Sequence, residues 1–158
     1  MGGMNAELDT QPSPLERRNN LLLIVAWLQA LVATVGSLYF SEIMGYIPCN
    51  MCWYQRILMY PLVAVFTVAL LRRDGNARAY GLPLAIGGLA AAIFHNLVYY
   101  NVVAEAQIGL CMVNVPCTTR WFEWFGFISI PQLSLIAFAV ITACLAFIRP
   151  TPAEVEAD

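Results

Sequence analysis

The stretch LLLIVAWLQALVATVGSLYF occupies residues 21–40 and carries no charged side chain. Its 20 residues, at about 1.5 Å per residue in an α-helix, are long enough to cross the roughly 30 Å hydrocarbon core of a bilayer. A backbone inside lipid must satisfy its own hydrogen bonds, which favours a helix. The stretch therefore predicts a transmembrane helix.

Three further apolar stretches follow, at residues 57–71, 79–104 and 124–148. The first has only 15 uncharged residues, so we expect its helix to begin near Trp53 and to carry Arg56 in its first turn. The fold class predicted from this pattern is all-α: a four-helix transmembrane bundle. We expect its helices over about residues 21–40, 53–71, 80–103 and 126–148.

The composition of the 158 residues agrees with a membrane protein. Hydrophobic residues make up 60% and charged residues 11%, whereas soluble domains carry about a quarter charged residues. The net charge of −2 argues against nucleic-acid binding, and the hydrophobicity argues against disorder. We expect a cytoplasmic N-terminal tail at residues 1–20, a transmembrane domain at 21–149 and an acidic C-terminal tail at 150–158.

The basic residues, all arginines, predict the orientation in the membrane. With four spans, one side of the bundle carries Arg17, Arg18, Arg72, Arg73, Arg78 and Arg149. The other side carries only Arg56 and Arg120. Positively charged loops stay in the cytoplasm, so we expect both termini there, with the loops before the second and fourth helices facing outward.

Four of the five cysteines fall in those two outward loops. Cys49 and Cys52 form a C-x-x-C motif in the first, and Cys111 and Cys117 form a second pair in the other. Disulfides persist outside the cytosol. Cys144 lies in the middle of the last predicted helix, where we interpret it as an inert packing residue.

A C-x-x-C bridge closes a very short loop, which gives little stabilisation, and its spacing is associated with lowered thiol pKa values. We therefore favour two redox-active pairs. Two alternatives stay open at this point: structural disulfides in a small tetraspan scaffold, and a four-cysteine zinc site, which an oxidising location disfavours. Four cysteines also allow three disulfide pairings.

Two polar residues inside predicted helices are further candidates. Arg56 shares a helix face with Cys52, four residues away, where a guanidinium favours the thiolate or holds a carbonyl-bearing ligand; the other interpretation is an interface anchor. His95, the only histidine, lies at membrane depth, either as a functional group or as a side chain satisfied by a neighbouring helix. No haem-attachment motif or glycine fingerprint appears, which leaves a lipid-soluble acceptor such as a quinone.

Two segments resemble a known family. The Pro-Cys-x-x-Cys-x-Tyr-x-Arg pattern at residues 48–56, within the longer run PCNMCWYQRILMYP at 48–61, is similar to the DsbB family of disulfide-forming membrane oxidoreductases, and most of all to its BdbC-like branch. The run WFGFISIP at residues 124–131 is similar too. The resemblance covers roughly residues 20–149.

The resemblance implies a protein-disulfide:quinone oxidoreductase in a bacterial cytoplasmic (inner) membrane. Such an enzyme reoxidises an extracytoplasmic thioredoxin-like thiol oxidase, of the DsbA or BdbD kind, and so generates disulfides de novo. It passes the electrons to membrane ubiquinone or menaquinone. A vitamin-K-epoxide-reductase-like enzyme uses similar logic, but its quinone-side pair ends a late helix, whereas the C-x-x-C motif here precedes the second helix.

The resemblance also implies catalytic roles for four cysteines. The partner would attack Cys111 and release Cys117, which can attack Cys49 and leave Cys52 as a thiolate facing the quinone. The second pair here is closely spaced, unlike that of the better-known proteobacterial members, so either of its cysteines could attack Cys49. The implied quinone contacts are Arg56, His95 and Trp53. No metal is expected.

Overall fold

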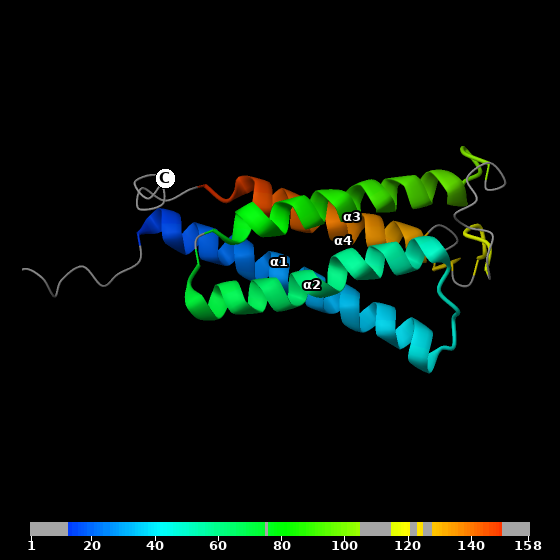
Figure 1. Cartoon of the computed structure of the whole chain (residues 1–158), viewed down its shortest axis with the longest axis horizontal. Helices are drawn as coiled ribbons and strands as arrows, with labels where there is room; N and C mark the ends of the chain where they lie inside the picture. The colour runs from blue at the N-terminus through cyan, green and yellow to red at the C-terminus, as the bar shows by residue number, and fades with distance from the viewer. Residues whose placement is uncertain (1–12, 75, 105–114, 121–122, 125–127, 150–158) are drawn as a thin grey trace, which may run out of the picture.

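The computed structural model describes residues 13–74, 76–104, 115–120, 123–124 and 128–149, and over these it is a bundle of four helices (Figure 1). The helices are α1 (Pro14–Leu38), α2 (Asn50–Arg72), α3 (Ala77–Tyr99) and α4 (Ile130–Phe147). A π-helical turn, η1 (Tyr39–Ile43), extends α1. The strands β1 (Glu123–Trp124) and β2 (Ile128–Ser129) form a minimal antiparallel pair before α4. The predicted all-α class is confirmed.

The first helix begins at Pro14, inside the segment that we expected to be a tail. Ser13 and Glu16 explain the early start, because they form a capping box. The Ser13 hydroxyl accepts from the Glu16 backbone N–H at 3.2 Å, and the Glu16 carboxylate accepts from the Ser13 N–H at 2.7 Å. Pro14 stands at the start of the helix, where its missing N–H costs nothing.

The other helix boundaries also differ from expectation by a few residues, for local reasons. α2 begins at Asn50, before Trp53, because the Cys49 side chain caps it. α3 ends at Tyr99 because Asn101 takes a left-handed conformation, with φ of 57°, that closes helices. α4 begins at Ile130, and residues 125–127 of its expected start lie outside the described residues.

All four helices are long and apolar enough to cross a membrane. They form a ring in which α1 packs against α2 and α4, and α3 packs against the same two helices. At one end, the Arg78 guanidinium donates to the Ile148 carbonyl at 3.1 Å and the Asn19 amide donates to the Arg149 carbonyl at 2.7 Å. The beginning of α1, the α2–α3 turn and the end of α4 therefore lie together, and the C-x-x-C motif lies at the opposite end (Figure 1).

Small residues line the buried face of α3 and let it approach its neighbours closely. The stripe runs through Gly81, Ala85, Gly88 and Ala92. A Cβ at Gly88 would lie 1.9 Å from the buried Phe138 ring of α4, so only glycine fits there. Small residues at such interfaces are typical of membrane helices. His95 follows on the same face and is thereby directed into the bundle.

The first helix packs tightly only as far as Ala30. Its buried residues are Leu23, Ala26 and Ala30, whereas Val32 and Val35, further along the helix, are 65% and 57% exposed. Figure 1 shows the end of α1 slanting away from the start of α2. The divergence leaves room inside the bundle at the end that carries the cysteines.

Candidate thiol redox site

Cys49 is the residue that caps the beginning of α2. Its backbone is extended, with φ of −71° and ψ of 170°, and its sulfur accepts a hydrogen bond from the Cys52 backbone N–H at 3.4 Å. Serine, threonine or aspartate ordinarily makes this contact. The positive end of the helix dipole therefore acts on the Cys49 sulfur and favours its thiolate.

A short chain of polar contacts runs from the cysteine pair into α3. The sulfurs of Cys49 and Cys52 are 2.9 Å apart, and both thiols are free. The Cys49 sulfur lies 3.7 Å from Nε2 of His95, whose Nδ1 lies 3.2 Å from the amide nitrogen of Gln55. If the amide donates to Nδ1, the ring proton is on Nε2 and points at the Cys49 sulfur.

These contacts lower the pKa of Cys49 to about 5. The largest cause is the hydrogen bond from the Cys52 side chain, and the His95 hydrogen bond acts in the same direction. Burial opposes both, because a charged sulfur loses hydration. The net result is a thiolate at neutral pH, which is the nucleophilic form of cysteine.

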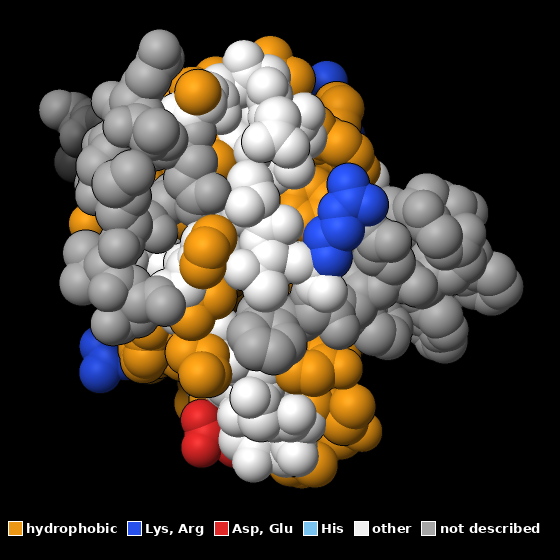
Figure 2. Space-filling model, turned by 90° about the vertical axis from the view of Figure 1, so that its right-hand side faces the viewer, with side chains coloured by type: hydrophobic (Ala, Val, Ile, Leu, Met, Phe, Trp, Pro, Cys, Tyr) orange, Lys and Arg blue, Asp and Glu red, His pale blue; other side chains and the backbone are white. Residues whose placement is uncertain are grey.

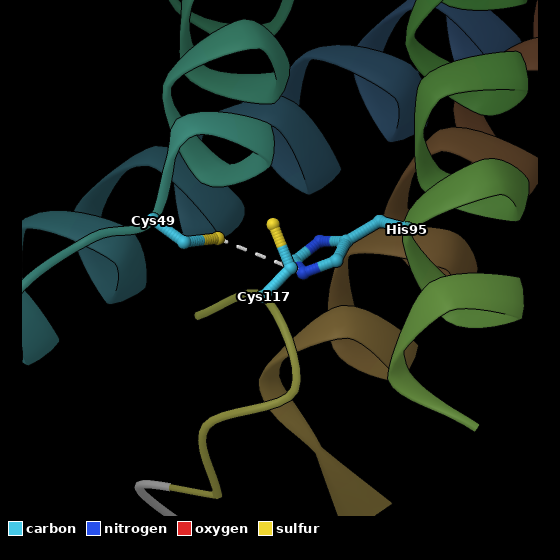
Figure 3. A group of neighbouring side chains, drawn as sticks. All are labelled: Cys49, His95 and Cys117. Atoms are coloured by element: carbon cyan, nitrogen blue, oxygen red, sulfur yellow. Dashed lines mark hydrogen bonds between the residues drawn. The ribbon is translucent and has the colours of Figure 1, made fainter. Parts of the chain in front are cut away.

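Cys117 brings the second pair of cysteines to the same place. It comes from the segment before β1, and Figure 3 shows it next to Cys49 at the start of α2 and His95 of α3. The sulfurs of Cys49 and Cys117 and a ring nitrogen of His95 all lie within 4.8 Å of one another, and all three residues are buried. Cys117 is disulfide-bonded. Cys111, the other predicted member of this pair, lies outside the described residues.

A cavity of about 290 Å³ opens beside the sulfurs, at the small end of the range for ligand pockets. The divergent end of α1 forms one wall, α4 forms another, and Cys52, Arg56 and Tyr60 line it from α2. These three residues follow one another at intervals of four, so they lie along one face of the helix. The sequence prediction that Cys52 and Arg56 share a face is confirmed.

Two polar atoms in the cavity wall are buried without a partner. Nε of Arg56 and the hydroxyl of Tyr60 make no hydrogen bond to any described residue. Arg56 is otherwise held in place: its Nη2 donates to the Ser37 carbonyl at 3.1 Å, and its guanidinium lies 5.3 Å from the centre of the Trp53 ring. Unpaired buried donors are costly, so both atoms are suited to a ligand with acceptor oxygens.

The other two predicted site residues in this part of the chain, His95 and Trp53, lie in different surroundings. His95 lines the cavity and also contacts Cys49, so it touches the cysteine pair as well as the space beside it. Trp53 does not line the cavity; its side chain is 52% exposed and supports Arg56 from outside. Cys144 carries a free thiol and packs against the hydrophobic core of the bundle, as expected.

Gln55 and Tyr60 were not among the predicted site residues. Gln55 is only 7% exposed, and a buried amide inside an apolar helix is itself a sign of a polar partner. Tyr60 continues the four-residue spacing of Cys52 and Arg56, which could have revealed it. Figure 2 faces the end of the bundle that carries this site, where the described side chains are mainly hydrophobic or uncharged.

The fold and site define a multi-pass membrane protein with two neighbouring free thiols at one end of a helical bundle. The family described as "Disulfide bond formation protein DsbB" matches residues 17–148. The chain therefore belongs to the DsbB family. Membership implies an oxidoreductase that acts in disulfide formation.

Relatives whose names refer to disulfide formation agree with this family assignment. Disulfide bond formation protein C of Bacillus subtilis (strain 168) is 44% identical over 134 residues, which cover 85% of this chain and 96% of the relative. A probable disulfide formation protein of Deinococcus radiodurans is 46% identical over 136 residues, covering 80% of this chain and 88% of the relative. The probable disulfide formation protein C 1 of Bacillus anthracis is 42% identical over 129 residues, covering 82% and 92%. No solved structure gives a significant match.

Proposed function

We propose that this protein oxidises the thiols of an extracytoplasmic thioredoxin-like partner and passes the electrons to a membrane quinone. The observation that carries the proposal is the meeting of three elements at one point. The Cys49–Cys52 pair, the Cys117 sulfur within 4.8 Å of Cys49, and a cavity with unpartnered donors all lie together. Sulfurs so placed can exchange disulfides, and the cavity offers a place for an acceptor.

The proposed relay is a series of thiol–disulfide exchanges that conserves electrons. A thiolate of the partner attacks Cys111 of a Cys111–Cys117 disulfide and releases Cys117 as a thiolate. Cys117 attacks Cys49 of the oxidised inner pair and releases Cys52. The second partner thiol then frees Cys111, which re-forms the Cys111–Cys117 bond and releases Cys49. The partner leaves with a disulfide, and two electrons remain on Cys49 and Cys52.

His95 stabilises the Cys49 thiolate in this proposal. Its Nε2, 3.7 Å from the Cys49 sulfur, is placed to stabilise the thiolate each time Cys49 is released. Gln55 holds the other ring nitrogen and so fixes the direction of the ring. The low pKa of Cys49 makes it a good leaving group, because a stable thiolate departs readily.

The residues in the cavity fit a quinone ring. Arg56 and Tyr60 present unpartnered donors, and quinone oxygens are acceptors. The wall between them and Cys52 is mostly apolar, as a ring-shaped lipid-soluble ligand requires. When bound there, a quinone takes up two electrons and two protons. We therefore propose that Arg56 and Tyr60 hold the quinone and that the Cys52 thiol faces it.

The arginine distribution supports an orientation with both termini in the cytoplasm. Arg78 lies with the chain ends at one end of the bundle, and the cysteines lie at the other. The positive-inside rule then places the cysteines on the outer face of a bacterial cytoplasmic membrane. The thioredoxin-like partner would meet them there.

Quinone absorbance, followed while the purified chain turns over a reduced thioredoxin-like oxidase and a soluble quinone, tests the proposal. We expect Cys49→Ser and Cys52→Ser to abolish turnover. Cys144→Ser is the matched control and should retain it, since its thiol only packs in the core. Full activity of Cys49→Ser would contradict the relay and favour a scaffold with structural disulfides.

A second experiment identifies the cysteine that reaches Cys49. In Cys52→Ser, the Cys49 thiol attacks the outer disulfide and releases one of its two cysteines, and alkylation of that released thiol prevents the reverse exchange. We expect peptide mapping without reductant to recover a Cys49–Cys117 linkage. A Cys49–Cys111 linkage in its place would assign the transfer to the other cysteine.

A further inference from the structure

Three side chains that can bind a metal ion lie together in this site. Thiol exchange alone would not require the histidine among them. Cys49, His95 and Cys117 are 7%, 1% and 2% exposed, and their donor atoms lie within 4.8 Å of one another (Figure 3). Thiolate and imidazole are the ligands that Zn²⁺ prefers. Cys52, with its sulfur 2.9 Å from that of Cys49, is the nearest further donor.

The spacing is close to that of a tetrahedral metal site. With Zn–S of about 2.3 Å and Zn–N of about 2.0 Å, a sulfur and a nitrogen on one ion lie about 3.6 Å apart. The Cys49 sulfur and Nε2 of His95 are 3.7 Å apart. The Cys117 sulfur, within 4.8 Å of both residues, needs to move by only about an ångström to complete the set, which side-chain rotation can supply.

Gln55 provides the outer contact that a metal-bound histidine requires. A histidine that ligates through one nitrogen usually donates from the other to a fixed acceptor. The Gln55 side chain lies 3.2 Å from Nδ1 of His95. Its amide oxygen and nitrogen exchange places on a half-turn of the terminal torsion, so the same residue can accept from Nδ1–H.

The site depends on the oxidation state of Cys117. In this structure Cys117 is disulfide-bonded, and a disulfide sulfur is no zinc ligand. Reduction of that bond turns Cys117 into a thiol beside two further free thiols. The ligand set is therefore complete only in the fully reduced protein.

We propose that the fully reduced protein binds one Zn²⁺ through Cys49, His95 and Cys117, and that the bound ion holds the protein in its reduced, inactive form. Binding displaces the thiol protons and changes no oxidation state. A metal-bound Cys49 sulfur cannot enter a disulfide, so reoxidation stops until the ion leaves. This goes beyond the proposed quinone reaction, although the inhibition that it describes rests on that reaction.

Cobalt provides the test, because Co²⁺ takes the place of Zn²⁺ and is coloured. The full chain, reduced and free of quinone in detergent, is titrated with Co²⁺. We expect thiolate-to-cobalt charge-transfer bands and intense tetrahedral visible bands that saturate at one equivalent and disappear on adding Zn²⁺. Absence of these bands, or equal bands in the fully oxidised protein, would overturn the proposal.

Variants assign the ligands. His95→Gln, which keeps a polar side chain, and Cys117→Ser should each weaken Co²⁺ binding more than 10-fold, and Gln55→Ala by about 10-fold. Cys144→Ser should bind as the unchanged protein does. Each variant is first shown to melt at a similar temperature. Unchanged binding by a folded His95→Gln or Cys117→Ser would overturn the assignment.

Inhibition is measured separately from binding. Zn²⁺ added to the reduced protein before quinone should slow the first turnover at least 10-fold, and a chelator should restore it. A protein that reduces quinone but binds no Co²⁺ overturns the metal site alone. A protein that binds Co²⁺ but never reduces quinone overturns the proposed function and leaves the binding site standing.

Discussion

Cys49 combines two roles that usually belong to different residues. Its sulfur accepts the Cys52 backbone N–H that begins α2, and it also contacts His95. A helix start, a hydrogen-bonding neighbour thiol and an imidazole all favour negative charge on one atom. We therefore expect the reactivity of the site to depend on Cys49 more than on Cys52 or His95 alone.

The first prediction concerns the charge of Cys49. As the pH rises through about 5, this residue passes from thiol to thiolate, so its nucleophilic fraction is complete at neutral pH. The ultraviolet absorbance of the thiolate, titrated in reduced Cys144→Ser protein, should show this low step. His95→Gln removes a donor that favours the thiolate and should move the step to higher pH. A first step above pH 8 in the Cys144→Ser protein would contradict the assignment.

The second prediction concerns the unpartnered donors. Arg56→Ala removes a charged donor from the cavity and should raise the quinone KM about 10-fold, since hydrogen bonds to charged groups contribute roughly 1.5–3 kcal/mol. Tyr60→Phe should raise it less, because its donor is neutral. Tyr54→Phe is the matched control: this tyrosine is 46% exposed on the same helix and does not line the cavity. An unchanged KM for Arg56→Ala would return Arg56 to the role of an interface anchor.

At the scale of the element, the small-residue stripe of α3 decides how close the helices come. Gly88 and Gly87 are neighbours in sequence but face different surroundings. A Cβ at Gly88 would meet the Phe138 ring at 1.9 Å, whereas a Cβ at Gly87 would meet only Leu58 atoms at 3.8 Å or more. The same stripe carries His95 into the site, so the packing of α3 and the position of His95 are linked.

The third prediction compares these two glycines. Gly88→Ala should destabilise the bundle by about 1–3 kcal/mol, as overpacking usually does, and lower the melting temperature in detergent. Gly87→Ala should be neutral or slightly stabilising, because alanine is the better helix former. Combining Gly88→Ala with Phe138→Leu should recover part of the loss. Equal melting temperatures for the two single variants would show that the α3–α4 contact is looser than described.

At the scale of the whole molecule, the two ends of the bundle have different tasks. At one end, Arg78 and Asn19 donate to the carbonyls that follow α4 and so hold the starts of α3 and α1 beside it. The other end carries Cys49, Cys52, Cys117 and the cavity. The proposed redox chemistry therefore lies at one end and Arg78 at the other, as the proposed orientation requires.

The fourth prediction tests this orientation. Asn76 lies exposed in the α2–α3 turn, and Ile43 is 71% exposed at the opposite end. A membrane-impermeant maleimide added to intact cells should label Ile43→Cys, whereas Asn76→Cys should react only after the cells are opened. Labelling is compared with the unchanged protein to account for its own cysteines. The reverse pattern would invert the proposed topology.

Much of this architecture could be predicted from the sequence, because uncharged runs near bilayer length have few alternatives to helices. The C-x-x-C spacing likewise predicted that Cys49 and Cys52 form a pair, and their sulfurs are 2.9 Å apart. The shared face of Cys52 and Arg56 followed from helical periodicity. The start of α1 was not predicted, because Ser13 and Glu16 lie in a polar segment and their capping contact is local.

The meeting of Cys117 with Cys49 and His95 could not be predicted from the sequence. It depends on where residues 115–120 lie against the bundle, and no sequence periodicity encodes such a position. The exclusion of Trp53 from the cavity has a similar origin. Its position next to Cys52 in sequence turns it to a different side of the helix, where it meets Arg56 from outside.

The capping contact of Cys49 has a mechanical consequence. A thiolate sulfur accepts hydrogen bonds well, whereas a sulfur in a disulfide accepts them weakly. We therefore expect the hydrogen bond from the Cys52 backbone N–H to Cys49 to be stronger when the pair is reduced than when it is oxidised. Each catalytic cycle would then strengthen and weaken this hydrogen bond in turn. Amide hydrogen exchange at Cys52 should therefore be slower in the reduced state.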